Sequence, residues 1–110
     1  TGRMIFVGRN NKENDWLTLK FASKTDLWFH TKDIPGSHVI LKTSGLNLDD
    51  IDKKDIMFAA SIAAKHSKGS ESENVPVDYV TVRHVKKPSG SKPGMVIFTD
   101  NKTVWINPAK

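Results

Sequence analysis

The sequence predicts an α+β fold, with a mostly antiparallel sheet and two main helices packed on it. Three observations indicate this class. Short apolar runs alternate with turn residues, two longer segments carry apolar residues at helical spacing, and neighbouring strands are joined by turns in place of regular helical crossovers. We expect the helices to pack on one face of the sheet.

The first two elements are a strand and a helix. The apolar run MIFVG, residues 4–8, ends in glycine, which predicts a buried strand. In the polar segment that follows, Asn10 or Asn11 can cap a helix, and Glu13 lies in its first turn, where a carboxylate is favourable. The residues of this helix that we expect to face the core are Trp16, Leu17 and Phe21.

A hairpin follows this helix. The segments LWFHT and SHVILKT, residues 27–31 and 37–43, predict two strands. Pro35 followed by Gly36 is typical of a type II turn, in which the glycine supplies a positive φ. Because successive side chains of a strand point to opposite faces, we expect one residue of the Trp–Phe pair to be buried and the other exposed.

The second helix is the clearest element. Residues 46–69 carry acids at the start, an alanine-rich centre and basic residues at the end, and Gly69 stops the helix. The N-cap is expected at Asp49, Asp50 or Asp52.

The C-terminal part predicts three strands. The first is the alternating segment 77–87, which a basic loop, 88–94, follows. The segments 95–99 and 103–108 then predict a final hairpin around the turn Asp-Asn-Lys.

Length and composition narrow the class of protein. The 110 residues suffice for one core, so we interpret 1–110 as a single domain. The absence of cysteine excludes a disulfide scaffold, a cysteine zinc site and a thiol nucleophile, and it fits a cytoplasmic protein. No apolar run reaches the ~20 residues of a membrane span, and no signal-peptide pattern is present. Because the chain lacks an initiator Met, we expect a domain cut from a longer protein.

Charge and aromatic residues point to nucleic acid. Seventeen Lys and Arg against twelve Asp and Glu give a net charge of +5, which attracts polyanions. Trp28, Phe29 and His30 could stack on unpaired bases; the competing interpretation places one of the first two, and Trp105, in the core. The segment 86–93 resembles a mobile loop that grips phosphate. The basic residues that we expect to contact phosphates are Lys32, Arg83, Lys86, Lys87 and Lys92.

Two catalytic interpretations are weaker. His30 and His38 would share a face if they pair across the hairpin, with Asp26 and Asp33 as oxygen ligands, but catalytic zinc takes three protein ligands and the usual histidine spacing is absent. Ser37 adjoins His38, yet adjacent strand residues point apart, and no nucleophile elbow or phosphate-binding loop is present. We therefore expect no enzyme activity, no metal and no cofactor.

The hairpin also resembles a known signature. The stretch DLWFHTKDIPGSHVIL, residues 26–41, is similar to the NFACT-R domain pattern Asp-x-Trp-Phe/Leu-His-x-x-x-x-Pro-Gly-Ser/Ala-His-Val. Three more segments resemble the same family and extend the likeness over nearly the whole chain: VGRNNKENDWLTLKFASKTD, DIMFAASIAAKHSK and VDYVTVRHVKKPSGSKPGMVIFTDNKTVWINP.

This resemblance implies an RNA-binding module at the C-terminus of an NFACT protein, a family known as RqcH and formerly as fibronectin-binding protein A. Such proteins act in ribosome-associated quality control: they bind the large ribosomal subunit, recruit alanyl-tRNA and promote alanine tailing of stalled nascent chains. The implied partners are tRNA, large-subunit ribosomal RNA and other domains of the same protein, with fibronectin as the alternative. The motif positions here are Asp26, Trp28, His30, Pro35, Gly36, Ser37 and His38.

Two roles remain open for the histidines. Either they contact RNA, or they lock the hairpin through hydrogen bonds with Asp26 and Asp33 as partners. The candidate RNA-binding residues are therefore Trp28, His30, Lys32, Ser37, His38, Arg83, Lys86, Lys87 and Lys92, and the structural ones are Asp26, Asp33, Pro35 and Gly36.

Overall fold

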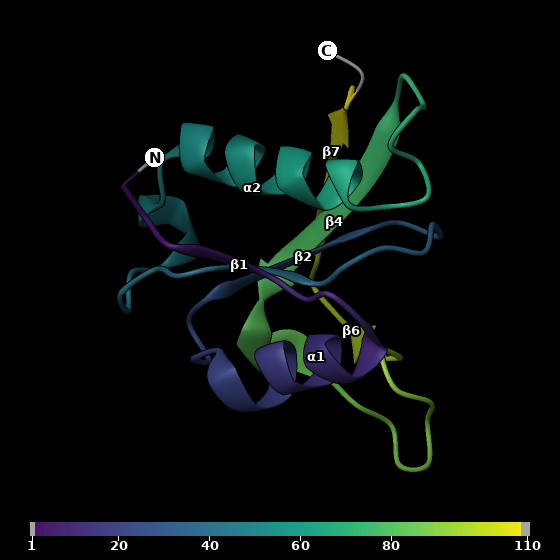
Figure 1. Cartoon of the computed structure of the whole chain (residues 1–110). Coiled ribbons are helices and arrows are strands. Elements are labelled where there is room, and N and C mark those ends of the chain that lie inside the picture. Colours follow the sequence, from purple (N-terminus) through teal and green to yellow (C-terminus); the bar gives the residue numbers. More distant parts are fainter. Residues whose placement is uncertain (1, 109–110) are drawn as a thin grey trace.

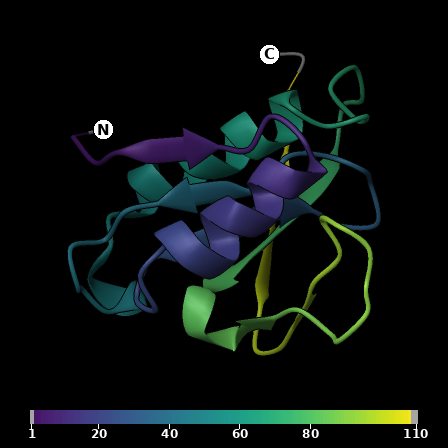
Figure 2. The same ribbon diagram turned by 60° about the horizontal axis from the view of Figure 1, so that its bottom comes forward.

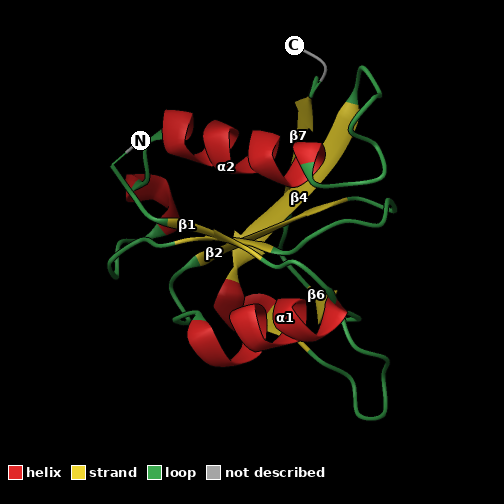
Figure 3. Cartoon of the chain, in the orientation of Figure 1, coloured by secondary structure: helices red, strands yellow, loops and turns green. Residues whose placement is uncertain are grey.

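The computed structural model describes residues 2–108 and confirms the α+β class. Its main sheet is antiparallel throughout, and Figure 3 shows its strands between helices above and below. In spatial order the five strands are β1 (Ile5–Val7), β3 (Val39–Leu41), β2 (Leu27–Thr31), β4 (Val75–Thr81) and β7 (Lys102–Ile106).

Helices cover both faces of this sheet, so the prediction of a single covered face is wrong. One face packs against α2 (Lys53–Lys65) and the other against α1 (Asn11–Trp16), as Figure 1 shows. The α1 helix continues as a π-helical turn, η1 (Leu17–Phe21). A small sheet of β5 (Val85–Lys86) and β6 (Ile97–Phe98) lies on the same side as α1. The chain also contains two short 3₁₀ helices, η2 (Leu48–Asp50) and η3 (Val82–His84).

The two covered faces create two hydrophobic clusters. Phe29 belongs to the cluster under α2, whereas Trp28 belongs to the cluster under η1 and the small sheet. Both side chains are buried, at 0% and 1% exposure. The alternation along β2 is therefore as predicted, but the inference that one of the two faces solvent is wrong, because the second face is covered by segments distant in sequence.

Both α1 and α2 begin directly after a residue whose side chain caps the helix N-terminus. The Oδ1 atom of Asn10 accepts a hydrogen bond of 2.8 Å from the backbone N–H of Glu13, which confirms a predicted cap. Asp52 caps α2 by accepting from Lys54 N at 2.8 Å. Along α1 and η1 the buried residues are Asn14, Leu17 and Thr18, so Trp16 lies outside this stripe and is exposed, contrary to its predicted place in the core.

The C-terminal strands pair differently from the predicted hairpin. The η3 turn interrupts the segment 77–87, so the chain leaves the main sheet after β4 and forms β5 in the small sheet. β6 then pairs with β5, while β7 pairs with β4. Figure 2 shows the long loop before β6 beside α1. Among residues 2–108, no helix is both long and apolar enough to cross a membrane.

Gly36 is needed for close approach and not for turn geometry. Its φ is not positive, so the predicted type II turn is wrong; at the hairpin tip it is Asp33 that has a positive φ, of 56°. Gly36 forms an isolated bridge to Ser67 after α2, and Lys68 N donates to Pro35 O at 2.8 Å. A Cβ atom on Gly36 would lie 2.9 Å from the Cβ of Ser67, which leaves no room for a side chain.

Replacing Gly36 by alanine is therefore expected to lower the free energy of unfolding by about 2 kcal/mol, because the hairpin tip and the end of α2 must separate. Urea unfolding of G36A measures this loss. The matched control is G2A, since a Cβ on Gly2 meets nothing within 4 Å. Equal stability of the two variants would contradict the assigned role of Gly36.

Candidate functional site

A cleft of ≈ 580 Å³ opens between the tip of the β2–β3 hairpin and the segment that leads into β6. Its wall is partly apolar, from Trp28, Met95 and Phe98, and partly polar. The polar residues whose side chains matter below are Asn14, His30, Lys32, His38, Asp78 and Asn101. The cleft is thus lined by residues from α1, from the strands β2 and β4, from the hairpin tip and from the C-terminal segments.

The two histidines share one face of the sheet. Trp28 pairs with Ile40, and Phe29 with Val39, so the same register places His30 of β2 opposite His38, which immediately precedes β3. Their ring centroids lie 5.6 Å apart in a T-shaped arrangement. Both rings line the cleft, as the cross-hairpin pairing requires.

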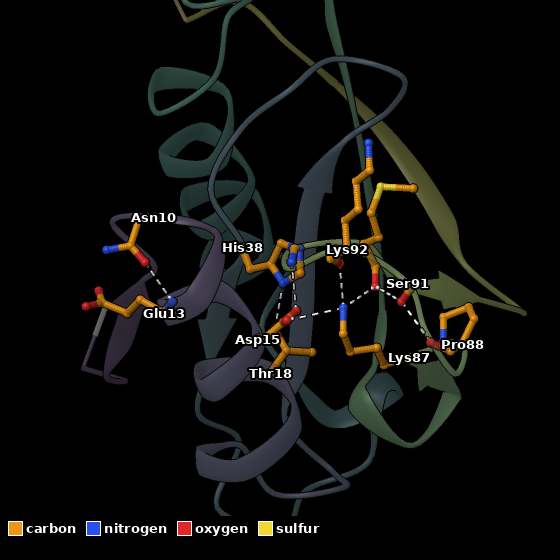
Figure 4. Close-up of polar contacts among 11 residues, drawn as sticks. Asn10, Glu13, Asp15, Thr18, His38, Lys87, Pro88, Ser91 and Lys92 are labelled. Atoms are coloured by element: carbon orange, nitrogen blue, oxygen red, sulfur yellow. Dashed lines mark hydrogen bonds and ion pairs between the residues drawn. The ribbon is translucent and has the colours of Figure 1, made fainter.

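His38 fastens the hairpin to the first helix. Its Nδ1 lies 2.8 Å from Thr18 Oγ1, and its backbone N–H donates to Asn14 Oδ1 at 3.1 Å (Figure 4 shows the Thr18 contact). The side chain is 2% exposed. The expected hydrogen bonds from the histidines to Asp26 and Asp33 are absent among the described residues, because the helix supplies the partners for His38.

Burial keeps both imidazoles neutral near neutral pH. Burial, together with the nearby His30, lowers the pKa of His38 to about 4, against the opposing effects of the backbone of Gly94 and Asn14 and the charge of Asp15. Burial also lowers the pKa of His30, against the backbone of Thr31 and Gly36 and the charge of Asp78. The described residues contain no group of three His, Cys, Asp or Glu side chains placed to hold a metal.

Asp26 lies away from the cleft and orders the loops around the start of β2. Its carboxylate accepts from Ser23 N at 2.8 Å and Thr43 N at 3.0 Å, and it pairs with the ammonium of Lys42. Burial alone would raise the pKa of Asp26, but the hydrogen bond from Lys42 and the two backbone bonds outweigh it and hold the pKa below its usual value. The role of Asp26 is therefore structural, as predicted, because its carboxylate holds these loops together.

The hairpin tip carries the other motif residues. Asp33 and Pro35 are exposed there, while Ser37 is half-buried and donates its backbone N–H to His66 O at 3.2 Å. Lys32 is exposed at the mouth of the cleft. The tip is thus built from backbone contacts to the end of α2 and leaves the ammonium of Lys32 in solvent.

The roles predicted for two tryptophans are exchanged. Trp28 is buried, with its ring stacked on His30 at 5.8 Å and tilted against Phe98 at 4.8 Å, so it is part of the cleft wall and not the exposed stacking ring that was predicted. Trp105, which the competing interpretation placed in the core, is 64% exposed. Val104 and Ile106 point to the α2 cluster, so the residue between them points to the opposite face, which carries the cleft.

The strand register brings Trp105 next to the cleft. Trp105 pairs with Pro76 on β4, and the backbone N–H of Lys32 donates to Pro76 O at 2.9 Å. These three residues form one row across the sheet. The neighbouring row contains His30, Asp78 and Thr103, in which Asp78 Oδ1 accepts from Thr103 Oγ1 at 2.6 Å. The surface of Lys32, Trp105 and the cleft is called the sheet face below.

The loop 88–94 is anchored at its base, and Lys87 is the anchor. Its Nζ lies 3.2 Å from Asp15 Oδ2 and donates to the backbone oxygens of Lys92 at 2.7 Å and Met95 at 3.1 Å (Figure 4). Asp15 also accepts from Gly94 N at 3.0 Å. The ammonium of Lys87 is therefore taken up by internal contacts, which disfavours the phosphate contact predicted for it.

The other basic residues that were predicted to contact phosphates are exposed, but they do not all lie on one surface. Lys92 is exposed beside Pro93, which lines the cleft. Arg83 and Lys86 are exposed on η3 and β5 and line neither this cleft nor a second one of ≈ 360 Å³. That second cleft adjoins the first through shared residues at the hairpin tip and α1. It adds two cations, Lys68 and Arg9, and Arg9 is paired with Glu13 at 3.1 Å.

Several site residues had weak or no sequence signals. Trp105 and Asp78 could have been placed on the sheet face by strict alternation, since each lies between residues of the α2 cluster. Asn14 and Thr18 have no local signal, because their contacts with His38 cross from a helix to a strand far along the chain.

Comparisons with known proteins show which family and which fold this chain resembles. Residues 1–100 match the family described as the NFACT protein RNA binding domain. Over 108 residues the chain is 49% identical to the Rqc2 homolog RqcH of Bacillus subtilis, covering 98% of this chain and 18% of that protein. Over 104 residues it is 31% identical to coiled-coil domain-containing protein 25 of Bos taurus, covering 93% and 50%.

A solved structure shows the same fold. The C-terminal part of the fibronectin/fibrinogen-binding protein from Streptococcus suis matches with a TM-score of 0.88 at 44% identity, over 97% of this chain and 42% of that one. The chain spans less than a fifth of RqcH and about half of the coiled-coil protein.

Proposed function

Because the chain belongs to the NFACT protein RNA binding domain family, we propose that it is the RNA-binding module of a ribosome-associated quality control factor. Its RNA is tRNA or large-subunit ribosomal RNA, and the whole protein acts in the cytoplasm to promote alanine tailing of stalled chains. The module binds without making or breaking bonds. The similarity to RqcH supports this role, and the sheet face carries the RNA-binding part of it.

The sheet face has the parts that single-stranded RNA requires. An exposed aromatic ring offers a stacking surface to any base, and a lysine close to it can pair with a phosphate. Trp105 and Lys32 supply this pair in one row of the sheet, on either side of Pro76. The exposed Trp105 beside a cation at the cleft is the single observation that carries the proposal.

The proposed function is tested by titrating the domain with fluorescent tRNA at two salt concentrations, with a polyanion of equal charge as competitor. We expect binding that persists near physiological salt and resists the competitor. If binding disappears under either condition, the net charge of +5 attracts RNA only weakly and without specificity. The proposal that the isolated domain binds RNA would then be wrong.

Replacing Trp105 by alanine is expected to weaken tRNA binding about tenfold or more, because a stacked base contributes roughly 1–3 kcal/mol. Its exposure means that the free energy of unfolding should change by less than about 0.5 kcal/mol. Fluorescence anisotropy gives the affinity. The matched control is W16A, which removes another exposed tryptophan, located on α1 and outside the row of Lys32, Pro76 and Trp105. Equal affinities of the two variants would remove Trp105 from the interface.

A second candidate function is protein binding of the adhesin type. It is favoured by the similarity to the Streptococcus suis protein, whose name describes fibronectin and fibrinogen binding. Capture of fibronectin by the isolated domain, without retention of RNA at physiological salt, would favour this alternative.

A further inference from the structure

The cleft in the sheet face has the size and walls of a site for a small planar group. Its ≈ 580 Å³ lies within the range of roughly 300–1,000 Å³ that is usual for ligand sites. Trp28, Phe98 and Met95 supply apolar wall on one side. A nucleobase has the matching shape, and its polar groups lie on its edge.

Two residues that line the cleft, Trp28 and Asp78, each carry a polar atom without a hydrogen-bond partner among the described residues. The Nε1–H of Trp28 is buried without an acceptor among the described residues. A buried donor left without a partner is costly, so a ligand acceptor placed there would be favoured. Asp78 offers the complementary group: its hydrogen bonds from Asn101 and Thr103 both end on Oδ1, and its Oδ2 has no donor from the described part of the chain.

The charges of the cleft distinguish a base from a phosphate. Inside it lie two neutral imidazoles, from His30 and His38, and the carboxylate of Asp78, which repels an anion. Lys32 is the one lysine or arginine among the described residues that line this cleft, and it is exposed at the mouth. A nucleotide would therefore place its base inside and its phosphates outside, near Lys32.

Building on the proposed RNA-binding function, we infer that this cleft binds one unstacked nucleobase that carries an exocyclic amino group. The amino group donates to Asp78, and a ring or carbonyl acceptor of the same base receives the indole N–H of Trp28. Adenine, cytosine and guanine carry such an amino group, whereas uracil does not. A missing donor opposite a carboxylate should weaken uracil about tenfold or more.

The inference is tested with ¹⁵N-labelled domain and three ribohexanucleotides, of adenosine, cytidine or uridine. The three tryptophans, Trp16, Trp28 and Trp105, each supply one indole N–H as a reporter in the same spectrum. We expect adenosine and cytidine hexamers to shift the Trp28 signal and to bind about tenfold more tightly than the uridine hexamer. An adenosine hexamer with abasic sites should leave that signal in place. The Trp16 signal serves as the internal control.

A conservative variant separates recognition from folding. D78N keeps the Oδ1 acceptor for Thr103 but replaces one carboxylate oxygen by an amide, so it should reduce the preference for adenosine over uridine while the domain stays folded. If the hexamers and tRNA bind but the Trp28 signal is unmoved and the abasic hexamer binds equally well, the cleft inference is overturned and the proposed function stands. If neither tRNA nor any hexamer binds, both fall.

Discussion

Acidification from pH 7 to pH 4 is expected to cost the domain about 3 kcal/mol of its free energy of unfolding through His38 alone. The pKa of His38 is about 4 in the folded state, against an ordinary value of 6.5. Between these two values the unfolded chain binds more protons than the native state, so stability rises with pH, is complete above pH 6.5 and is lost as the pH falls toward 4. His30, whose pKa is also lowered, adds with the same sign.

Urea unfolding at several pH values between 4 and 7 measures this effect. The variant H38Q keeps an acceptor for Thr18 but cannot be protonated, so its stability should depend much less on pH in this window. H66Q, at an exposed histidine after α2, is the matched control and should retain the wild-type dependence. Parallel stability curves for H38Q and wild type would contradict the assignment of a buried, neutral His38.

The variant D26N is expected to lower the free energy of unfolding by about 2–3 kcal/mol at pH 7. It removes the charge that pairs with Lys42, and it replaces one carboxylate oxygen by an NH₂ that cannot accept from Ser23 N or Thr43 N. Urea unfolding measures this loss as a lower midpoint concentration, with an unchanged dependence of the free energy of unfolding on urea concentration.

The control for D26N makes the same chemical change at the hairpin tip. D33N replaces an exposed Asp, and Asn tolerates the positive φ of 56° found there. D33N should therefore differ from wild type by less than about 0.5 kcal/mol. If D33N destabilises the domain as much as D26N does, the assignment of a stabilising role to Asp26 and not to Asp33 is wrong.

The hairpin was predictable because its information is local. Alternation and turn residues define two strands, and the pairing of Trp28 with Ile40 extends to His30 and His38 without further assumptions. The same holds for the cap at Asn10, which needs only the residues of one turn.

The errors arise where a distant segment decides the environment. Trp28 is buried because η1 and the small sheet cover it, and no pattern within β2 contains that information. Gly36 meets Ser67, and Lys87 meets Asp15, across the fold. A glycine or a lysine read in isolation suggests a turn or a free charge, whereas the tertiary contacts use these residues to hold loops.

The central claim, that the sheet face binds RNA, is tested most directly by reversing charge on one side of the domain. K32E/K92E changes two exposed lysines, one that lines the cleft and one next to Pro93 in the cleft wall, and K53E/K54E makes the same change at the start of α2, on the opposite face. Both have the same net charge. We expect K32E/K92E to bind tRNA at least about tenfold more weakly, with a salt slope shallower by roughly 1.4, and K53E/K54E to remain close to wild type. Equal losses in the two variants would mean that only net charge attracts RNA and would contradict a specific interface on the sheet face.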